Sequence, residues 1–171
     1  LIFLAQGGAP PEMLEEAGEH LRRLEGAMGK TLGDPDDPLL VSVRSGAKFS
    51  MPGMMDTVLN LGLNDRSVEG LAKQTEGDVR FARDAYRRFI QMFGKIVMDV
   101  PADAFEHALD EAKRAKSDGA QDTDLDAEDL SALIERFRAI YREHTGEDFP
   151  QDPKEQLRLA LDAVFNSWNG T

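Results

Sequence analysis

The chain contains no cysteine among its 171 residues. This absence excludes disulfides, thiolate catalysis and cysteine-based zinc sites, and it fits a reducing compartment, so we expect a cytoplasmic protein. Long hydrophobic runs are also missing. The longest, residues 1–5, is far shorter than the roughly 20 residues that cross a bilayer, and it lacks the pattern of a signal peptide. The chain begins at Leu1 rather than Met, so we expect the true start to lie upstream.

Basic residues are scarce relative to acidic ones, with 20 Lys and Arg against 32 Asp and Glu and a formal net charge of −12. Such a charge repels nucleic acid backbones and anionic lipid headgroups, so we expect neither nucleic acid nor a membrane as a partner. The 41% of hydrophobic and 30% of charged residues are typical of a folded globular protein. A binding site for an anionic ligand would need a few Arg or Lys side chains whose positive charge offsets the negative charge of the rest of the chain.

Three patterns that could indicate a catalytic or metal site are incomplete. Residues 29–31 (Gly-Lys-Thr) resemble the end of a P-loop, but the required glycine five residues before the first of them is Leu24. Asp122, Asp124 and Asp126 resemble the start of a calcium loop that lacks its later Gly and Glu, so a capped helix start explains them better. The histidines have no metal-ligand spacing, and we expect them on helix surfaces: His20, His107 and His144.

Most of the chain has the apolar spacing of amphipathic helices. Residues 39–43 form one short buried strand, and residues 1–9 contain a strand-like piece. The predicted fold class is therefore mainly α with a few short β-strands. A lone strand needs neighbours, so we expect part of its sheet to be missing from this chain. Expected helices cover residues 11–28 and 65–75, and further helices begin at Asp78, Pro101, Asp126 and Pro153. A polar loop over residues 117–126 separates the helix that begins at Pro101 from the one that begins at Asp126.

Two of these helices have a clear apolar stripe that we expect to face the core. On the first helix the stripe consists of Leu14, Ala17, Leu21, Leu24 and Met28. On the helix after Asp78 it consists of Phe81, Ala85, Phe89, Met92, Phe93 and Ile96.

The segment after the predicted strand has the residue types of a phosphate site. Arg44 directly follows the strand, where side chains face the crevice at the strand's carboxyl end. Arginine stays charged and can hold two phosphate oxygens, while Ser45 adds a hydroxyl and Gly46 allows close approach. Pro52 and Gly53 form a second turn that could present backbone N–H groups to an anion. The alternative is a surface salt bridge at Arg44 and a loop that only connects.

The same segment carries a family resemblance. Residues 43–47 (VRSGA), 50–57 (SMPGMMDT) and 59–65 (LNLGLND) resemble the nucleotide-binding domain of pyruvate, phosphate dikinase, and the likeness extends over about residues 25–169. Further matching segments are residues 80–82 (RFA), 86–92 (YRRFIQM), 149–153 (FPQDP) and 163–168 (AVFNSW).

The resemblance implies an incomplete ATP-grasp-like nucleotide-binding domain with an inserted helical subdomain. Residues 1–63 would form part of the nucleotide-binding subdomain, residues 64–150 the helical subdomain, and residues 151–171 a helix returning to the remainder. The family interconverts ATP, phosphate and pyruvate with AMP, diphosphate and phosphoenolpyruvate, through a phosphohistidine on a separate swivelling domain. The parent protein is expected to be a homodimer.

The resemblance also implies the site residues. Arg44 would contact the ATP phosphates as the catalytic residue of this segment, and the loop around it would cover them. The implied ATP-binding residues are Arg44, Ser45, Gly46, Pro52, Gly53, Met54, Met55, Asp56 and Thr57. No metal ligand is expected in this chain, because the family's acidic pair for Mg²⁺ and its Gly-Gly-Lys-Gly loop are not in the sequence. The chain alone is therefore expected to be inactive.

Two other functions stay open at the level of the sequence. One is a non-catalytic helical interaction module derived from such a domain. The other is a related ATP-grasp phosphotransferase that acts on a different acceptor, although the SMPGMMDT run argues against it.

Overall fold

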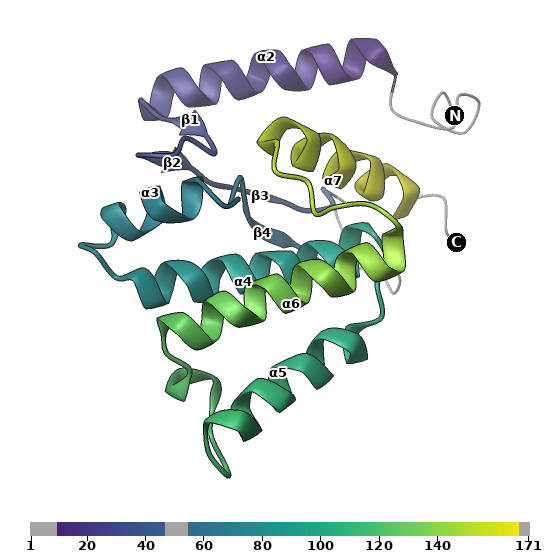
Figure 1. Ribbon diagram of the computed structural model, residues 1–171. Coiled ribbons are helices and arrows are strands. Elements are labelled where there is room, and N and C mark those ends of the chain that lie inside the picture. Colours follow the sequence, from purple (N-terminus) through teal and green to yellow (C-terminus); the bar gives the residue numbers. More distant parts are fainter. Residues whose placement is uncertain (1–9, 47–54, 168–171) are drawn as a thin grey trace.

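The computed structural model describes residues 10–46 and 55–167, and Figure 1 shows how they are arranged. The mainly helical prediction is confirmed. The long helices are α2 (Pro11–Met28), α4 (Val79–Val97), α5 (Ala102–Lys116), α6 (Ala127–Thr145) and α7 (Pro153–Ser167). The shorter elements are α3 (Ser67–Gln74), the 3₁₀ turn η1 (Asp122–Asp124) and the strands β1 (Thr31–Leu32), β2 (Pro38–Leu39), β3 (Val41–Val43) and β4 (Val58–Leu61).

Local sequence signals set the helix ends as predicted. Pro11 occupies the first turn of α2, and Gly29 ends that helix with a left-handed φ of 65°. Asp78 caps α4 by accepting a hydrogen bond from the backbone N–H of Phe81. Asp126 opens α6 with a capping box, and Gly146 ends it at a φ of 77°.

The strands form two small sheets rather than one. In the first, β1 pairs with β2 in parallel. In the second, β3 pairs antiparallel with β4, with Val41 opposite Leu61 and Val43 opposite Val58. The prediction of a single strand over residues 39–43 is therefore wrong, because β2 and β3 belong to different sheets. The structure also gives β3 a neighbour, β4, that the sequence did not predict.

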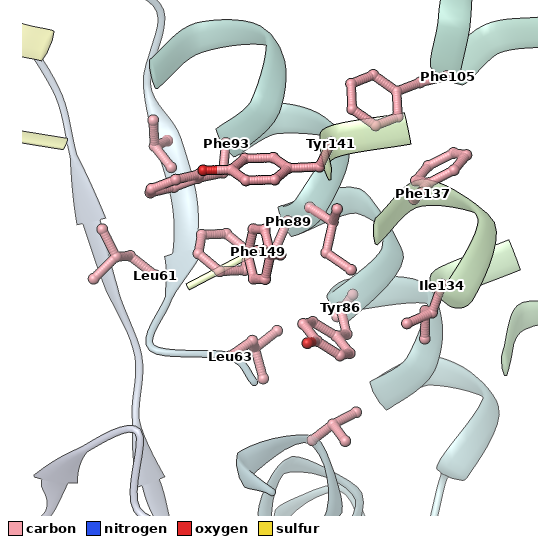
Figure 2. Packing of buried hydrophobic residues seen from close by; sticks show 14 of the residues in the cluster. Leu61, Leu63, Tyr86, Phe89, Phe93, Phe105, Ile134, Phe137, Tyr141 and Phe149 are labelled. Atoms are coloured by element: carbon pink, nitrogen blue, oxygen red, sulfur yellow. The ribbon is translucent and has the colours of Figure 1, made fainter. Parts of the chain in front are cut away.

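An aromatic cluster forms the centre of the molecule (Figure 2). Phe149, in the connection between α6 and α7, packs edge-on against four rings at centroid distances of 5.4 to 6.3 Å. Those rings are Tyr86, Phe89 and Phe93 of α4 and Tyr141 of α6. Such edge-to-face pairs add to the stabilisation from burial alone.

The core is continuous from the helices to the β3–β4 hairpin. Val58 and Leu61 of β4 are fully buried, in the same cluster as the aromatic rings. Figure 2 shows Leu61 and Leu63 on the strand side of the cluster, with Leu63 toward Tyr86. The hairpin is therefore anchored to α4 by apolar packing, which is the main stabilising force in such contacts.

The predicted apolar stripes are covered only in part. Helix α2 has no buried residue, and Leu24 and Met28 are 42% and 54% exposed. On α4, Ala85, Phe89 and Phe93 are buried as predicted, but Phe81 is 50% exposed, so its assignment to the core face is wrong. The neighbouring Ala82 is 1% exposed, so the first turn of α4 is covered on one side and Phe81 lies on its other, solvent-facing side.

Candidate functional site: the end of the β3–β4 hairpin

The β3–β4 hairpin brings the two ends of the predicted phosphate loop together. Val43 and Val58 are paired across the ladder and are both buried. Arg44 and Thr57 are the next residues beyond this pair, so they lie at the same end of the hairpin. The sequence placed these residues in one loop, and the structure adds that a core-anchored strand pair holds both ends of it.

Three residues follow β3 with different surroundings. Arg44 is exposed and forms no ion pair with a carboxylate of the described part of the chain. Ser45 is only 9% exposed and has a contact of its own. Gly46 is exposed, and no atom of the described residues lies within 4 Å of the position where a Cβ would stand. Within the described residues, this arrangement offers an anion a guanidinium without a carboxylate partner next to a glycine.

The residues before β4 border a surface hollow. Met55 is half-buried against the core, and Asp56 and Thr57 are exposed. Met55 and Asp56 line a hollow of about 350 Å³ together with the C-terminal turns of α4 and α7. Lys95 of α4 also lines it, and sequence reasoning missed this basic residue because its helical position gave no sign of the neighbouring loop. The remaining predicted site residues, Pro52, Gly53 and Met54, lie outside the described residues.

A polar network holds the segment after β4. The side chain of Asn64 accepts hydrogen bonds from the backbone N–H groups of Arg66 and Ser67 and donates one to the carbonyl of Gln151. The hydroxyl of Tyr86 donates to Asp65 at 2.8 Å and accepts from the amide of Gln151. Burial raises the pKa of Tyr86 well above its usual value, so the hydroxyl stays protonated as a donor.

This network joins two segments that are far apart in sequence. The run LGLND at residues 61–65 meets the run FPQDP at residues 149–153 through these bonds. Both runs are among the motifs that carry the family resemblance, and the structure gives them a scaffolding role beneath the hairpin.

The comparison with known proteins agrees with these motifs. No family model matches the chain. It is 56% identical over 160 residues to pyruvate, phosphate dikinase of Clostridium symbiosum, 54% identical to the chloroplastic enzyme of Flaveria pringlei and 55% identical to the Giardia intestinalis enzyme. The chain is related to pyruvate, phosphate dikinase. These alignments cover 92–94% of the chain but only 16–18% of the relatives' length.

The likeness to pyruvate, phosphate dikinase therefore concerns one segment of a much longer protein. The relatives are enzymes of the phosphotransferase class, as the word dikinase states. Among the described residues, no helix is both long and apolar enough to cross a membrane.

The arginines in the helical motifs shared with pyruvate, phosphate dikinase have structural partners. Arg80 donates to the carbonyls of Asp122 and Leu125 at 2.8 Å. The side chain of Arg87 is 3% exposed and pairs with Asp84 on its own helix and, at 3.5 Å, with Asp122. These bonds attach α4 to η1, so neither arginine is free to bind a phosphate group.

The candidate metal and phosphocarrier residues have surface positions. His20, His107 and His144 are exposed on α2, α5 and α6. Asp126 caps α6 and pairs with Lys116, and the neighbouring lysine lowers its pKa to about 2. In the described ranges, no group of three or more His, Asp or Glu side chains is arranged to hold a metal ion.

Proposed function

We propose that this chain is part of the ATP-binding domain of a pyruvate, phosphate dikinase and that Arg44 contacts the phosphates of ATP. The observation that supports this most directly is the placement of Arg44. It is a guanidinium without a carboxylate partner in the described structure, in a chain of net charge −12, directly after a strand fixed in the core. Arginine in that setting holds phosphate oxygens by paired, charge-assisted hydrogen bonds.

The neighbouring residues have supporting roles in this proposal. Gly46 would let a phosphate group approach the backbone, because no atom of the described residues stands where a Cβ would be. Ser45, Asp56 and Thr57, together with Met55, would border the bound nucleotide at the two ends of the loop. Pro52, Gly53 and Met54 would cover it.

The fold assignment belongs to the same proposal. The β3–β4 hairpin and α7 would be part of an ATP-grasp-like domain, with residues 64–150 as an inserted helical subdomain. The parent protein would be a cytoplasmic homodimer that interconverts ATP, phosphate and pyruvate with AMP, diphosphate and phosphoenolpyruvate. A phosphohistidine on a swivelling domain of the same chain would carry the phosphoryl group.

Magnesium does not fit the described residues of this chain. They contain no cluster of three or more potential ligands, and Mg²⁺ needs carboxylate ligands in octahedral geometry. The ligands of the ion would therefore lie, in the parent protein, outside these residues. For the same reason we expect the chain alone to bind ATP without cleaving it.

The test is an NMR titration of the ¹⁵N-labelled chain with ATP. A charge-assisted contact contributes about 1.5–3 kcal/mol, while millimolar affinity needs about 4 kcal/mol, so we expect dissociation constants in the millimolar range or weaker. The shifts should concentrate on residues 44–46 and 55–57, and Arg44→Ala should abolish them. Arg23→Ala on α2 is the matched control, because Arg23 is also exposed and forms no ion pair in the described structure. Equal losses in both variants would show general charge attraction rather than a site.

In a full-length parent protein, Arg44→Ala should lower phosphoryl transfer by about a hundredfold or more, the scale of losing one preorganised donor. ATP cleavage by the purified chain that Arg44→Ala leaves unchanged would show that the chemistry lies elsewhere.

A second function, a helical interaction module, is favoured by one observation. Helix α2 has no buried residue, and its apolar side chains line a groove of about 300 Å³ against α7. The same titration separates the two functions, since a non-catalytic module would give no ATP shifts that depend on Arg44.

A further inference from the structure

The turn after β4 is held from several sides at Gly62. Its backbone N–H donates to the side-chain oxygen of Gln156 at 3.0 Å, and its carbonyl accepts from the hydroxyl of Ser67 at 2.8 Å. The φ of Gly62 is +114°, and an added Cβ would lie 3.1 Å from the carbonyl oxygen of Leu39 in β2. Only glycine fits this conformation and this close approach.

The amide of Gln156 connects this turn to two other segments. Gln156 lies on α7 and is fully buried. Besides accepting from Gly62, its amide nitrogen donates to the carbonyl of Leu63 at 2.9 Å and to that of Pro150 at 2.8 Å. One buried side chain therefore ties the end of β4 to α7 and to the connection that carries the central Phe149. Buried bonds of this kind specify a unique arrangement, because leaving any of these groups unpaired is costly.

This connection lies at the opposite end of the hairpin from Arg44. Leu61, the residue before Gly62, pairs with Val41, and the ladder continues through one irregularity in register to Val43 opposite Val58. Val58 and Leu61 are both fully buried at the two ends of β4, so a shift of β4 along β3 would take these side chains out of the core. The hydrogen bonds at Gly62 therefore hold β4 in its pairing with β3. This pairing in turn determines the position of Arg44, the first residue after β3.

We infer that Gln156 is a positioning residue for the Arg44 site. It holds β4 in register against α7, and the paired strand β3 then presents Arg44 to the anion. The inference rests on the proposed role of Arg44 in phosphate binding. Ser67 has the same function, because its hydroxyl binds the carbonyl oxygen of Gly62. Neither residue touches the ligand.

The test compares variants of the 171-residue chain by NMR, first without ligand. Gln156→Met keeps the size and the unbranched shape of the side chain but removes all three hydrogen bonds. We expect changed amide shifts at residues 43–46 and 55–59 and a weakened backbone contact between Val43 and Val58. The amides of α5 and α6 should keep their wild-type shifts. Ser67→Ala should give the same pattern, and it serves as the readout if Gln156→Met does not fold.

Two control variants separate positioning from a general loss of stability. Ala160→Gly changes a fully buried residue of α7, one turn beyond Gln156, and destabilises the helix without touching Gly62. Lys154→Ala changes an exposed residue two positions before Gln156. Both controls should leave the hairpin shifts unchanged, even where Ala160→Gly lowers the melting temperature as far as Gln156→Met does.

An ATP titration completes the test. The affinity of Gln156→Met should fall by about tenfold, which corresponds to about 1.4 kcal/mol and to the loss of one charge-assisted contact, while Ala160→Gly should bind like the wild type. If Gln156→Met keeps the wild-type hairpin shifts, or if Ala160→Gly changes them equally, Gln156 has no positioning role. If the wild-type chain shows no ATP shifts, the proposed function fails, and the unliganded spectra still decide whether Gln156 sets the place of Arg44.

Discussion

Replacing Phe149 with alanine should be among the most destabilising single changes in the described structure. Phe149 is 2% exposed, and its ring packs edge-on against Tyr86, Phe89, Phe93 and Tyr141. Truncating a buried phenylalanine costs about 3–5 kcal/mol through lost burial and the remaining cavity. We expect a value near the upper end, since edge-to-face pairs each add about 0.5–1.5 kcal/mol beyond burial and four are lost.

The size of the loss can be compared with the whole stability. Domains are stable by about 5–15 kcal/mol, so Phe149→Ala removes a third or more of a typical value. For a chain of this length, a loss of 1 kcal/mol lowers the melting temperature by about 2–4 °C, which predicts a decrease of roughly 10 °C or more.

The assay is urea unfolding with thermal melts, and the chain supplies its own control. Phe81 is the same residue type on α4 but is 50% exposed, so Phe81→Ala should change the stability by less than about 0.5–1 kcal/mol. Both variants should keep the wild-type dependence on urea, because that slope reports the surface exposed on unfolding. Equal losses for the two variants would refute the assignment of Phe149 to the centre of the core.

Three further predictions test local features. The pKa of Asp126 is about 2 rather than 3.8, so the capping carboxylate stabilises the fold above about pH 4 and this contribution is lost as the pH falls toward 2. Asp126→Asn keeps a capping side chain, so its melting temperature should fall less between pH 5 and pH 2 than that of the wild type. Gly94→Ala should cost about 1–3 kcal/mol in urea unfolding, since its Cβ would lie 2.8 Å from a ring of α5, whereas Gly26→Ala on α2 meets no atom within 4 Å and should stabilise by up to about 1 kcal/mol. Residues 64–150 expressed alone should give a helical circular dichroism spectrum and a cooperative melt, because α4, α5 and α6 pack on one another, and a gradual melt would contradict this.

The helix ends could be predicted from the sequence because their signals are local. A capping side chain such as Asp126 bonds to a backbone N–H only two or three residues away, and a C-terminal glycine such as Gly146 needs only its own left-handed φ. Family motifs could be read in the same way, since VRSGA and SMPGMMDT are continuous runs. The relation to pyruvate, phosphate dikinase is therefore visible in the amino-acid sequence alone.

The strands were predicted less well because a strand depends on a partner elsewhere in the chain. The run at residues 39–43 is apolar throughout apart from Ser42, and nothing in it shows that Leu39 pairs with β1 while Val41 and Val43 pair with β4. Val58–Leu61 gave no clear signal because two of its four residues, Leu59 and Asn60, are not buried. Pairing between distant segments is decided by packing rather than by local preference.

The sequence by itself determined the helices, their ends, the acidic surface and the family, because each of these depends on composition or on neighbours a few residues away. Tertiary structure alone decided which apolar faces are covered, as the partly covered stripe of α2 and the exposed Phe81 show. It also decided that Gln156 bonds to Gly62, across 94 residues of sequence, and that Arg44 and Thr57 meet at one end of a hairpin. Burial and register are properties of the folded chain, since they exist only when distant segments pack against one another.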